Sequence, residues 1–138
     1  MSTLKVDNLL NAAGNQSPIS VPGAAKAWVN FNGTTGTVNQ NDVTIRGSYN
    51  VDSVTDNGTG DYTVTFTNAM ANANYCIQVS ANDDGTGSNM ADGFAYGGWK
   101  RGANSVVFTT TSARIQIGYP TNTNYYDLTH IMVAFFGD

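Results

Sequence analysis

The sequence predicts an all-β protein, an antiparallel β-sandwich of jelly-roll-like type. Three observations lead to this fold class. Asn and Thr supply 17 residues each and Gly supplies 15, a composition that favours turns and strand faces over helix interiors. Apolar residues recur at every second position in several short segments, which is the period of a half-buried strand. Gly and Asn interrupt these segments, as they do in sandwiches built from many short strands.

The size and charge of the chain narrow its possible partners. Its 138 residues fit one domain with a hydrophobic core. The net charge of -4, in which every acidic residue is Asp, repels a phosphate backbone, so we expect no nucleic-acid partner. The N-terminus lacks the apolar stretch of a signal peptide and no apolar run is long enough to cross a bilayer. We therefore expect synthesis in the cytoplasm and no membrane partner.

Residues 1–23 are expected to form an N-terminal leader, or attachment segment, and a linker ahead of a β-sandwich domain at 24–138. The leader ends in a stretch bearing Gly, Ser and Pro. Leu9 and Leu10 would be poorly covered so close to a chain end. Two interpretations stay open, because these leucines can fold back onto their own domain or dock on another subunit.

Alternation begins at AKAWVNFNG, residues 25–33, where Ala27, Val29 and Phe31 share one face and Trp28 lies on the other. VTIRGSYNV, residues 43–51, is the next predicted strand. In DYTVTFT, residues 61–67, apolar and Thr side chains alternate, and the preceding Asn57-Gly58 suits a tight turn. We therefore predict a hairpin over 53–66.

Three further strands are predicted at YCIQVSA (75–81), SVVFTTT (105–111) and RIQIGY (114–119). Cys76 lies within the first of these, and we interpret it as a small packed residue of the core. A single cysteine excludes a disulfide within the chain.

The last predicted strand, HIMVAFFGD (130–138), is apolar in both phases. An antiparallel strand of a two-layer sandwich needs only one covered face, so the second face predicts a third layer or a subunit contact. Trp28 raises the same question, since its ring can be covered by another protomer or by an edge or loop of its own chain. The predicted subunit interface consists of Leu9, Leu10, Trp28, Met132, Ala134 and Phe136.

The segments AKAWVNFNG, SYNVDSVTDNGTGDYTVTFTNAMANANY and VAFFGD, with the opening MSTLKVDNL, resemble a module widespread in tailed bacteriophages, especially those of marine bacteria and cyanobacteria. The resemblance runs from Ser2 to about Val79 and returns at 130–138. It implies an all-β module, often trimeric, exposed on the virion. The expected function is therefore that of a virion structural protein in a tail fiber, with other virion proteins as partners.

Two alternatives stay open beside the tail fiber, namely a capsid decoration or head-fiber protein and a carbohydrate-binding receptor-recognition knob. The knob would use aromatic side chains in GFAYGGWKRG and YPTNTNYYDL to contact a host surface polysaccharide or protein. The other interpretation of the first segment is a bulged strand whose aromatic side chains enter the core. The candidate receptor-contact residues are Phe94, Tyr96, Trp99, Tyr125 and Tyr126.

Metal and catalytic chemistry are not expected, and no cofactor is implied. Asp83, Asp84 and Asp92 offer oxygen ligands of the kind Ca²⁺ accepts, but the sequence contains no Glu for the bidentate position of an EF-hand. Glycoside hydrolysis needs one carboxyl held protonated, and nothing apolar flanks Asp83 and Asp84 to raise a pKa. His130 is the single histidine and begins a buried strand. We therefore predict a protein that is not an enzyme.

Overall fold

The computed structural model of the chain describes residues 23–82, 96–98, 108–118 and 125–137. Within these ranges the regular structure consists of eight β-strands and no helix. The strands are β1 (Ala27–Asn32), β2 (Thr44–Tyr49), β3 (Val51–Gly58), β4 (Asp61–Phe66), β5 (Cys76–Asn82), β6 (Tyr96–Gly98), β7 (Ser112–Gly118) and β8 (His130–Phe136). The all-β class predicted from the period of two is confirmed.

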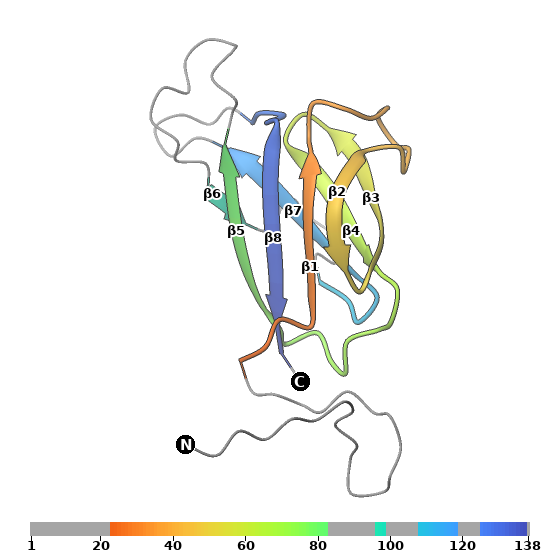
Figure 1. Cartoon of the computed structure of the whole chain (residues 1–138), viewed down its shortest axis with the longest axis vertical. Helices are drawn as coiled ribbons and strands as arrows, with labels where there is room; N and C mark the ends of the chain where they lie inside the picture. Colours follow the sequence, from red (N-terminus) through yellow and green to blue (C-terminus); the bar gives the residue numbers. More distant parts are fainter. Residues whose placement is uncertain (1–22, 83–95, 99–107, 119–124, 138) are drawn as a thin grey trace, which may run out of the picture.

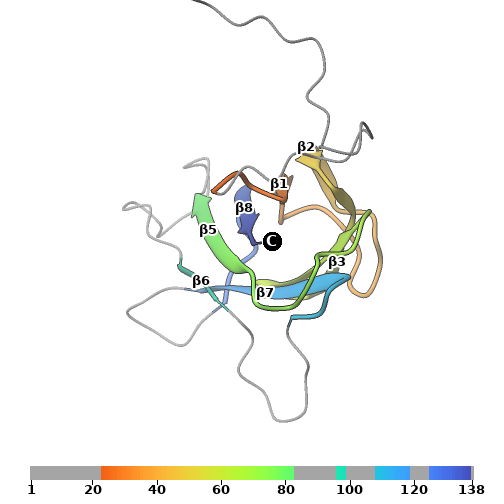
Figure 2. The same ribbon diagram turned by 90° about the horizontal axis from the view of Figure 1, so that it is seen from below.

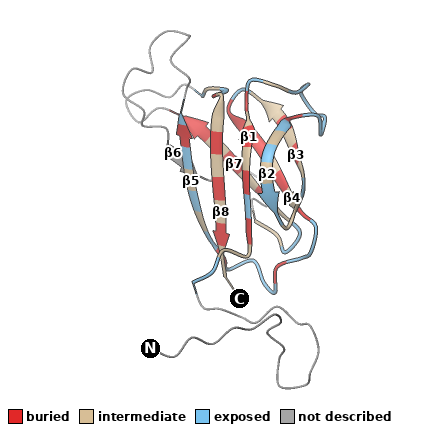
Figure 3. Cartoon of the chain, viewed as in Figure 1, coloured by how far each residue is buried: buried red, intermediate tan, exposed pale blue. Residues whose placement is uncertain are grey.

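The strands form two antiparallel sheets that face each other (Figure 1 and Figure 2). The first, which we call the β1 sheet, has the strand order β2-β1-β8-β5, and the second, the β4 sheet, has the order β3-β4-β7-β6. Apolar side chains of both sheets form one core, and Figure 3 shows that the buried residues lie on strands of both sheets. Each sheet thus buries one face, as in a two-layer sandwich.

The β1 sheet is organised around the pairing of the first and last described strands. Ala27, Val29 and Phe31 are buried on β1. Opposite them stand three buried residues of β8, in the pairs Ala27↔Phe135, Val29↔Val133 and Phe31↔Ile131. Side chains of directly paired residues point to the same face of a sheet. The apolar residues of β1 and β8 in these pairs therefore all point into the core.

The predicted second strand ends earlier than its sequence pattern suggested. Asn50 lies between β2 and β3 and has φ +53, a left-handed conformation that Asn tolerates. Its side-chain amide donates to the carbonyl oxygens of Lys26 and Asn68, both at 3.1 Å. The chain therefore crosses from one sheet to the other at this single residue, and VTIRGSYNV is divided between β2 and the start of β3.

The predicted hairpin is present as β3 and β4, and Tyr62, Val64 and Phe66 are buried in phase as expected. The turn, however, lies at residues 59–60 and not at Asn57-Gly58. Gly60 has φ +64, and a Cβ there would lie 2.5 Å from the carbonyl oxygen of Ile117. Only glycine fits this position, so the turn forms two residues later than the Asn-Gly signal indicated.

The strand predicted over SVVFTTT was wrong in its last residues. Residues 105–107 lie outside the described ranges, and Phe108 forms only an isolated bridge with Ala113. The Thr109 hydroxyl accepts hydrogen bonds from the backbone N–H groups of Thr111 at 3.1 Å and Ser112 at 2.9 Å. The Thr109 side chain therefore closes a tight turn ahead of β7. Its local hydrogen bonds to the backbone replace those that a continuing strand would make with a neighbouring strand.

An aromatic cluster closes one end of the core. Phe66 packs edge-on against Phe135 with ring centroids 4.9 Å apart, and Tyr75 contacts Phe66, Phe108 and Phe135 at 5.7–5.9 Å. The contacts among Phe66, Tyr75 and Phe135 are edge-to-face, which is the favoured geometry for aromatic pairs, and the contact of Tyr75 with Phe108 is tilted. They join residues of both sheets and of the segment that precedes β5.

Tyr62 ties together the loops at the other end. Its buried hydroxyl lies 2.9 Å from the carbonyl oxygen of Gly33 and 2.6 Å from Oδ1 of Asp127. The same Oδ1 accepts a 2.7 Å hydrogen bond from the backbone N–H of Gly60. Burial and the neighbouring Asp127 carboxylate raise the pKa of the Tyr62 phenol well above its ordinary value. The neutral hydroxyl thus holds three chain segments in place.

The ends of the described domain lie together, away from these loops. Ala27 is paired with Phe135 at the end of the β1 sheet where β8 finishes, and Figure 1 shows that the described chain enters β1 and leaves β8 at this end. The β1–β2 loop, the β3–β4 turn and the end of β5 lie at the opposite end (Figure 1). We call this opposite end the distal end.

We expect Tyr75 to make stability fall at alkaline pH. Its hydroxyl lies 3.0 Å from the carbonyl oxygens of both Thr109 and Ser112, and burial raises its pKa from 10.0 to about 12. The neutral phenol stabilises the fold fully below pH 10, and this contribution is lost as the pH rises through about 12. Tyr75→Phe should lower the free energy of unfolding by about 1 kcal/mol near neutral pH.

Urea denaturation of both proteins across this pH range measures the effect. The difference in unfolding free energy between wild type and Tyr75→Phe should shrink between pH 10 and about 12. A difference that stays constant would contradict the role given to the buried phenol.

Candidate functional site

The outer face of the β1 sheet gathers residues from all four of its strands. One row across the sheet runs Tyr49, Trp28, Ala134, Gln78, and the next runs Gly47, Asn30, Met132, Ser80. Phe136 and Cys76 are paired in the row on the chain-end side. We call this surface the Trp28 face and define it by its outward side chains: Trp28, Asn30, Tyr49, Cys76, Gln78, Ser80, Met132, Ala134 and Phe136.

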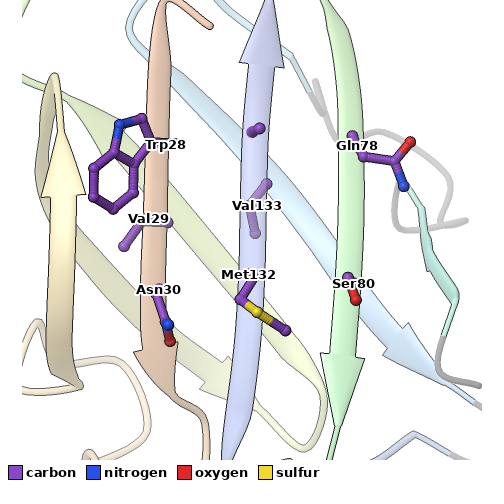
Figure 4. A pocket seen from close by; sticks show the side chains of 8 residues that line it. Trp28, Val29, Asn30, Gln78, Ser80, Met132 and Val133 are labelled. Carbon is purple, nitrogen blue, oxygen red and sulfur yellow. The ribbon is translucent and has the colours of Figure 1, made fainter. Parts of the chain in front are cut away.

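A shallow hollow of about 350 Å³ lies in the Trp28 face. Its lining surface is almost wholly apolar and comes from β1, β5 and β8 (Figure 4). The lining residues are Trp28, Val29, Asn30, Gln78, Ser80, Met132, Val133 and Ala134. A hollow of this kind is suited to receive an apolar or aromatic group.

Trp28 stands at the border of the hollow and remains 42% exposed. Its indole is turned toward β2 (Figure 4) and lies over Gly47, where an added Cβ would be 3.5 Å from Cη2 and Cζ3 of the ring. Part of the ring is therefore covered by a strand of its own chain. The rest of the ring is exposed. The structure therefore leaves open whether another protomer covers the ring in addition to the edge strand of its own chain.

The strands that form the Trp28 face carry no carboxylate. The acidic residues of the described ranges lie in the β1–β2 loop, in β3 and β4, and just before β8: Asp42, Asp52, Asp56, Asp61 and Asp127. Arg46 of β2 is exposed, and its Nη1 lies 3.5 Å from Oδ1 of Asn30. This surface is therefore free of the negative charge that the chain carries elsewhere.

The outer face of the β4 sheet has a different chemistry. Its outward side chains are polar and half-buried: Ser53, Thr55, Thr63, Thr65, Ser112, Arg114 and Gln116. Arg114 forms a bidentate ion pair with Asp61, with Nε and Nη2 at 2.7 and 2.8 Å from the carboxylate oxygens. The hydrogen bond and charge of Asp61 raise the pKa of Arg114. This face resembles an ordinary wet sheet surface.

Four residues of the predicted subunit interface are placed on the Trp28 face. Trp28 is directly opposite Ala134, and Met132 and Phe136 lie in the same phase of β8. These three β8 side chains are only half-buried in the chain. Leu9 and Leu10 lie outside the described residues. The interface assignment stays a prediction, but its described members do share one surface.

Two neighbours on this surface were missed by the sequence analysis. Tyr49 is 54% exposed and pairs with Trp28, and Gln78 pairs with Ala134. The period of two gave each residue a face within its own strand. It gave no register between strands, and therefore no way to bring these residues beside Trp28.

The candidate receptor-contact residues are only partly described. Tyr125 is 42% exposed, whereas Tyr126 is half-buried and packs against the core. These opposite environments agree with the expectation that neighbouring tyrosines point in opposite directions. Tyr96 begins β6, while Phe94 and Trp99 lie outside the described residues. Receptor contact therefore stays a prediction.

The weak metal candidates Asp83, Asp84 and Asp92 also lie outside the described residues. In the part of the chain that the structure places, no three His, Cys or Asp side chains are grouped as metal ligands. His130 is half-buried at the start of β8, with Nδ1 3.1 Å from the hydroxyl of Thr129. This contact gives His130 a structural neighbour and leaves the prediction about catalysis open.

Cys76 was wrongly predicted to be a core residue. It is exposed as the first residue of β5, and Ile77 and Val79 take the inward phase against β8. The apolar run was correctly interpreted as a strand. Cys76, however, falls in the same phase as Gln78 and Ser80 and therefore points outward.

Comparison with protein-family models, curated proteins and solved structures returned no match for this chain. Within the described ranges, none of the structure is a helix of the length and hydrophobicity that crossing a bilayer requires. The functional assignment therefore depends on the geometry of the two sheet faces and on the residues quoted above.

We expect Arg114→Gln to destabilise the fold without changing assembly. Asp61 is 4% exposed, and losing its bidentate partner should lower the free energy of unfolding by roughly 1–3 kcal/mol. Chemical denaturation measures this loss, and light scattering measures the oligomeric state. Unchanged stability would show that the ion pair does not support the β4 sheet.

Proposed function

We propose that this protein is a non-enzymatic structural component of a tailed-bacteriophage virion that assembles as a homo-oligomer, a trimer, within a tail fiber. The observation that carries the proposal is the contrast between the two sheet faces. One is polar and contains an internal ion pair, whereas the other is free of carboxylates, hollowed and lined by apolar groups. The trimer and the virion setting come from the sequence resemblance.

The Trp28 face has the composition of a subunit contact. Interfaces are rich in aromatic residues and Met and poor in charge at their centre, and a few buried aromatics contribute most of the binding energy. Trp28 and Tyr49 are large aromatic side chains left 42% and 54% exposed. Met132 and Phe136 extend the same surface along β8. A contact between copies would cover the outward apolar side chains of β8.

The strand connections support a jelly-roll-like fold for the module. The first described strand pairs with the last in one sheet, and β4 pairs with β7 in the other. Successive strands cross between the sheets at Asn50 and between β4 and β5. Pairing of the first strand with the last also occurs in jelly rolls, which are found among viral capsid proteins, whereas the pairing of consecutive strands within one sheet (β1–β2, β3–β4 and β6–β7) is that of a simpler sandwich.

The placement of the loops agrees with host contact by the proposed fiber. Both ends leave the domain on one side, and the loops gather at the distal end (Figure 1). Tyr125 is exposed beside Gly118, at the end of β7 that also pairs with Tyr96. A domain attached at one end thus presents loops at the other, where binding residues are commonly found.

Competition for adsorption tests the fiber assignment. Purified protein in its native oligomeric state is added to host cells before phage, and free phage is counted over time. We expect slower adsorption, because the isolated domain occupies the receptor. Unchanged adsorption together with binding to capsids would instead support the decoration alternative and overturn the tail-fiber assignment.

Trp28→Ala should weaken self-association at least about tenfold, since removing a central aromatic anchor commonly costs more than 1.4 kcal/mol. Light scattering over a dilution series measures the association constant. Thr63→Ala, on the outer face of the β4 sheet, is the control and should associate like the wild type. If Trp28→Ala also associates like the wild type, the Trp28 face is not the subunit contact.

A further inference from the structure

The Trp28 face carries a ridge and a hollow next to each other. Trp28 and Tyr49 are paired across β1 and β2 and are the large exposed aromatics of this face, and we call this pair the ridge. On the other side of Trp28, Ala134 contributes only a methyl group, between Trp28 and Gln78. The hollow of about 350 Å³ lies there. Protruding and recessed features therefore occupy neighbouring positions of the same sheet.

Gly47 keeps these two features apart. The Trp28 ring atoms Cη2 and Cζ3 would lie 3.5 Å from a Cβ at Gly47, so the indole rests on the backbone of β2. With the ring turned toward β2 (Figure 4), the hollow that Ala134 helps to line stays open. A long side chain at either Gly47 or Ala134 would remove this arrangement.

We propose that the ridge of one copy of this chain inserts into the hollow of a second copy. This inference rests on the proposed homo-oligomer and adds the contact that forms it. Ridge and hollow lie on one face. In a twofold arrangement each copy therefore inserts its ridge into the hollow of the other, and in a cyclic arrangement each copy inserts its ridge into the hollow of the next. Tyr49 and Gln78 thereby join Trp28 and Ala134 as contact residues.

The charges on the face fit a second copy better than a charged partner. The chain has a net charge of -4, yet the strands that form the Trp28 face carry no carboxylate. Two copies can therefore meet here with their acidic residues pointing elsewhere. A basic partner would find no carboxylate on these strands to pair with. An acidic partner would find Arg46 of β2 as the one Lys or Arg of these strands and would meet the overall negative charge of the chain.

The size of the face sets how much of it a contact with a second copy must use. Four strands about 4.8 Å apart and about seven residues long span roughly 400 Å² in projection, whereas a standard contact buries about 800 Å² of accessible surface on each partner. The contact must therefore use the whole relief of the sheet and not the hollow alone. A second copy offers a sheet of matching dimensions with the complementary relief.

Two variants separate the two halves of the contact. Tyr49→Ser truncates the ridge and leaves the hollow intact, because Tyr49 is not among its lining residues. Ala134→Phe fills the hollow and leaves the ridge intact. Each variant alone should weaken self-association at least about tenfold, a loss of 1.4 kcal/mol. Thr65→Phe, which adds an aromatic ring to the outer face of the β4 sheet, is the matched control and should associate like the wild type.

Mixing the two variants gives the decisive measurement. In a mixed pair, the intact ridge of Ala134→Phe meets the intact hollow of Tyr49→Ser, so one complete contact forms per pair in a twofold or a cyclic arrangement. Pull-down of one variant by the tagged other variant should therefore recover at least threefold over pull-down of either variant by a tagged copy of itself. Circular dichroism of each variant checks that the fold is retained.

Each remaining outcome overturns a specific statement. If both variants lose association and the mixture does not recover, these residues lie in the interface but the ridge does not enter the hollow. If Ala134→Phe associates like the wild type while the wild type is oligomeric, the homo-oligomer stands and the inferred contact fails. If the wild type is monomeric at every concentration, the proposed homo-oligomer fails as well.

Discussion

The antiparallel pairing of β1 with β8 is the constraint on which the rest of the molecule depends. It places Ala27, Val29 and Phe31 against buried residues of β8. The same register leaves Trp28 on the outside, opposite Ala134. A shift of one residue would exchange the two faces, moving Trp28 into the core and the small apolar residues to the surface. Core packing and the Trp28 face are therefore two results of one register.

The parts predicted from sequence are those that a local period can reveal. The alternation of β1 and β4 identified their inward residues, and the two apolar phases of β8 identified Met132, Ala134 and Phe136 as side chains of interest. Register, turn position and sheet crossing depend on distant residues. The β3–β4 turn lies at Gly60 because Ile117 and Tyr126 approach it from other segments, and Tyr49 lies beside Trp28 through a pairing that no local pattern encodes.

The interactions that hold the sandwich together lie away from the candidate contact face. Tyr62 fixes the loops at the distal end through Gly33 and Asp127, and the Phe66, Tyr75 and Phe135 cluster closes the other end. Large exposed side chains such as Trp28 and Tyr49 contribute little to this core. Their substitution therefore reports on association with limited disturbance of the fold.

The distribution of charge explains how one sandwich can present two different surfaces. Asp61 and Arg114 compensate each other on the β4 sheet, so that face is stable in water without a partner. On the β1 sheet the strands carry no carboxylate, and contact there depends on apolar area and shape. Such a contact is little affected by screening, since salt weakens charge pairs far more than apolar burial. An assembly formed through the Trp28 face would therefore keep its strength over a wide range of ionic strength.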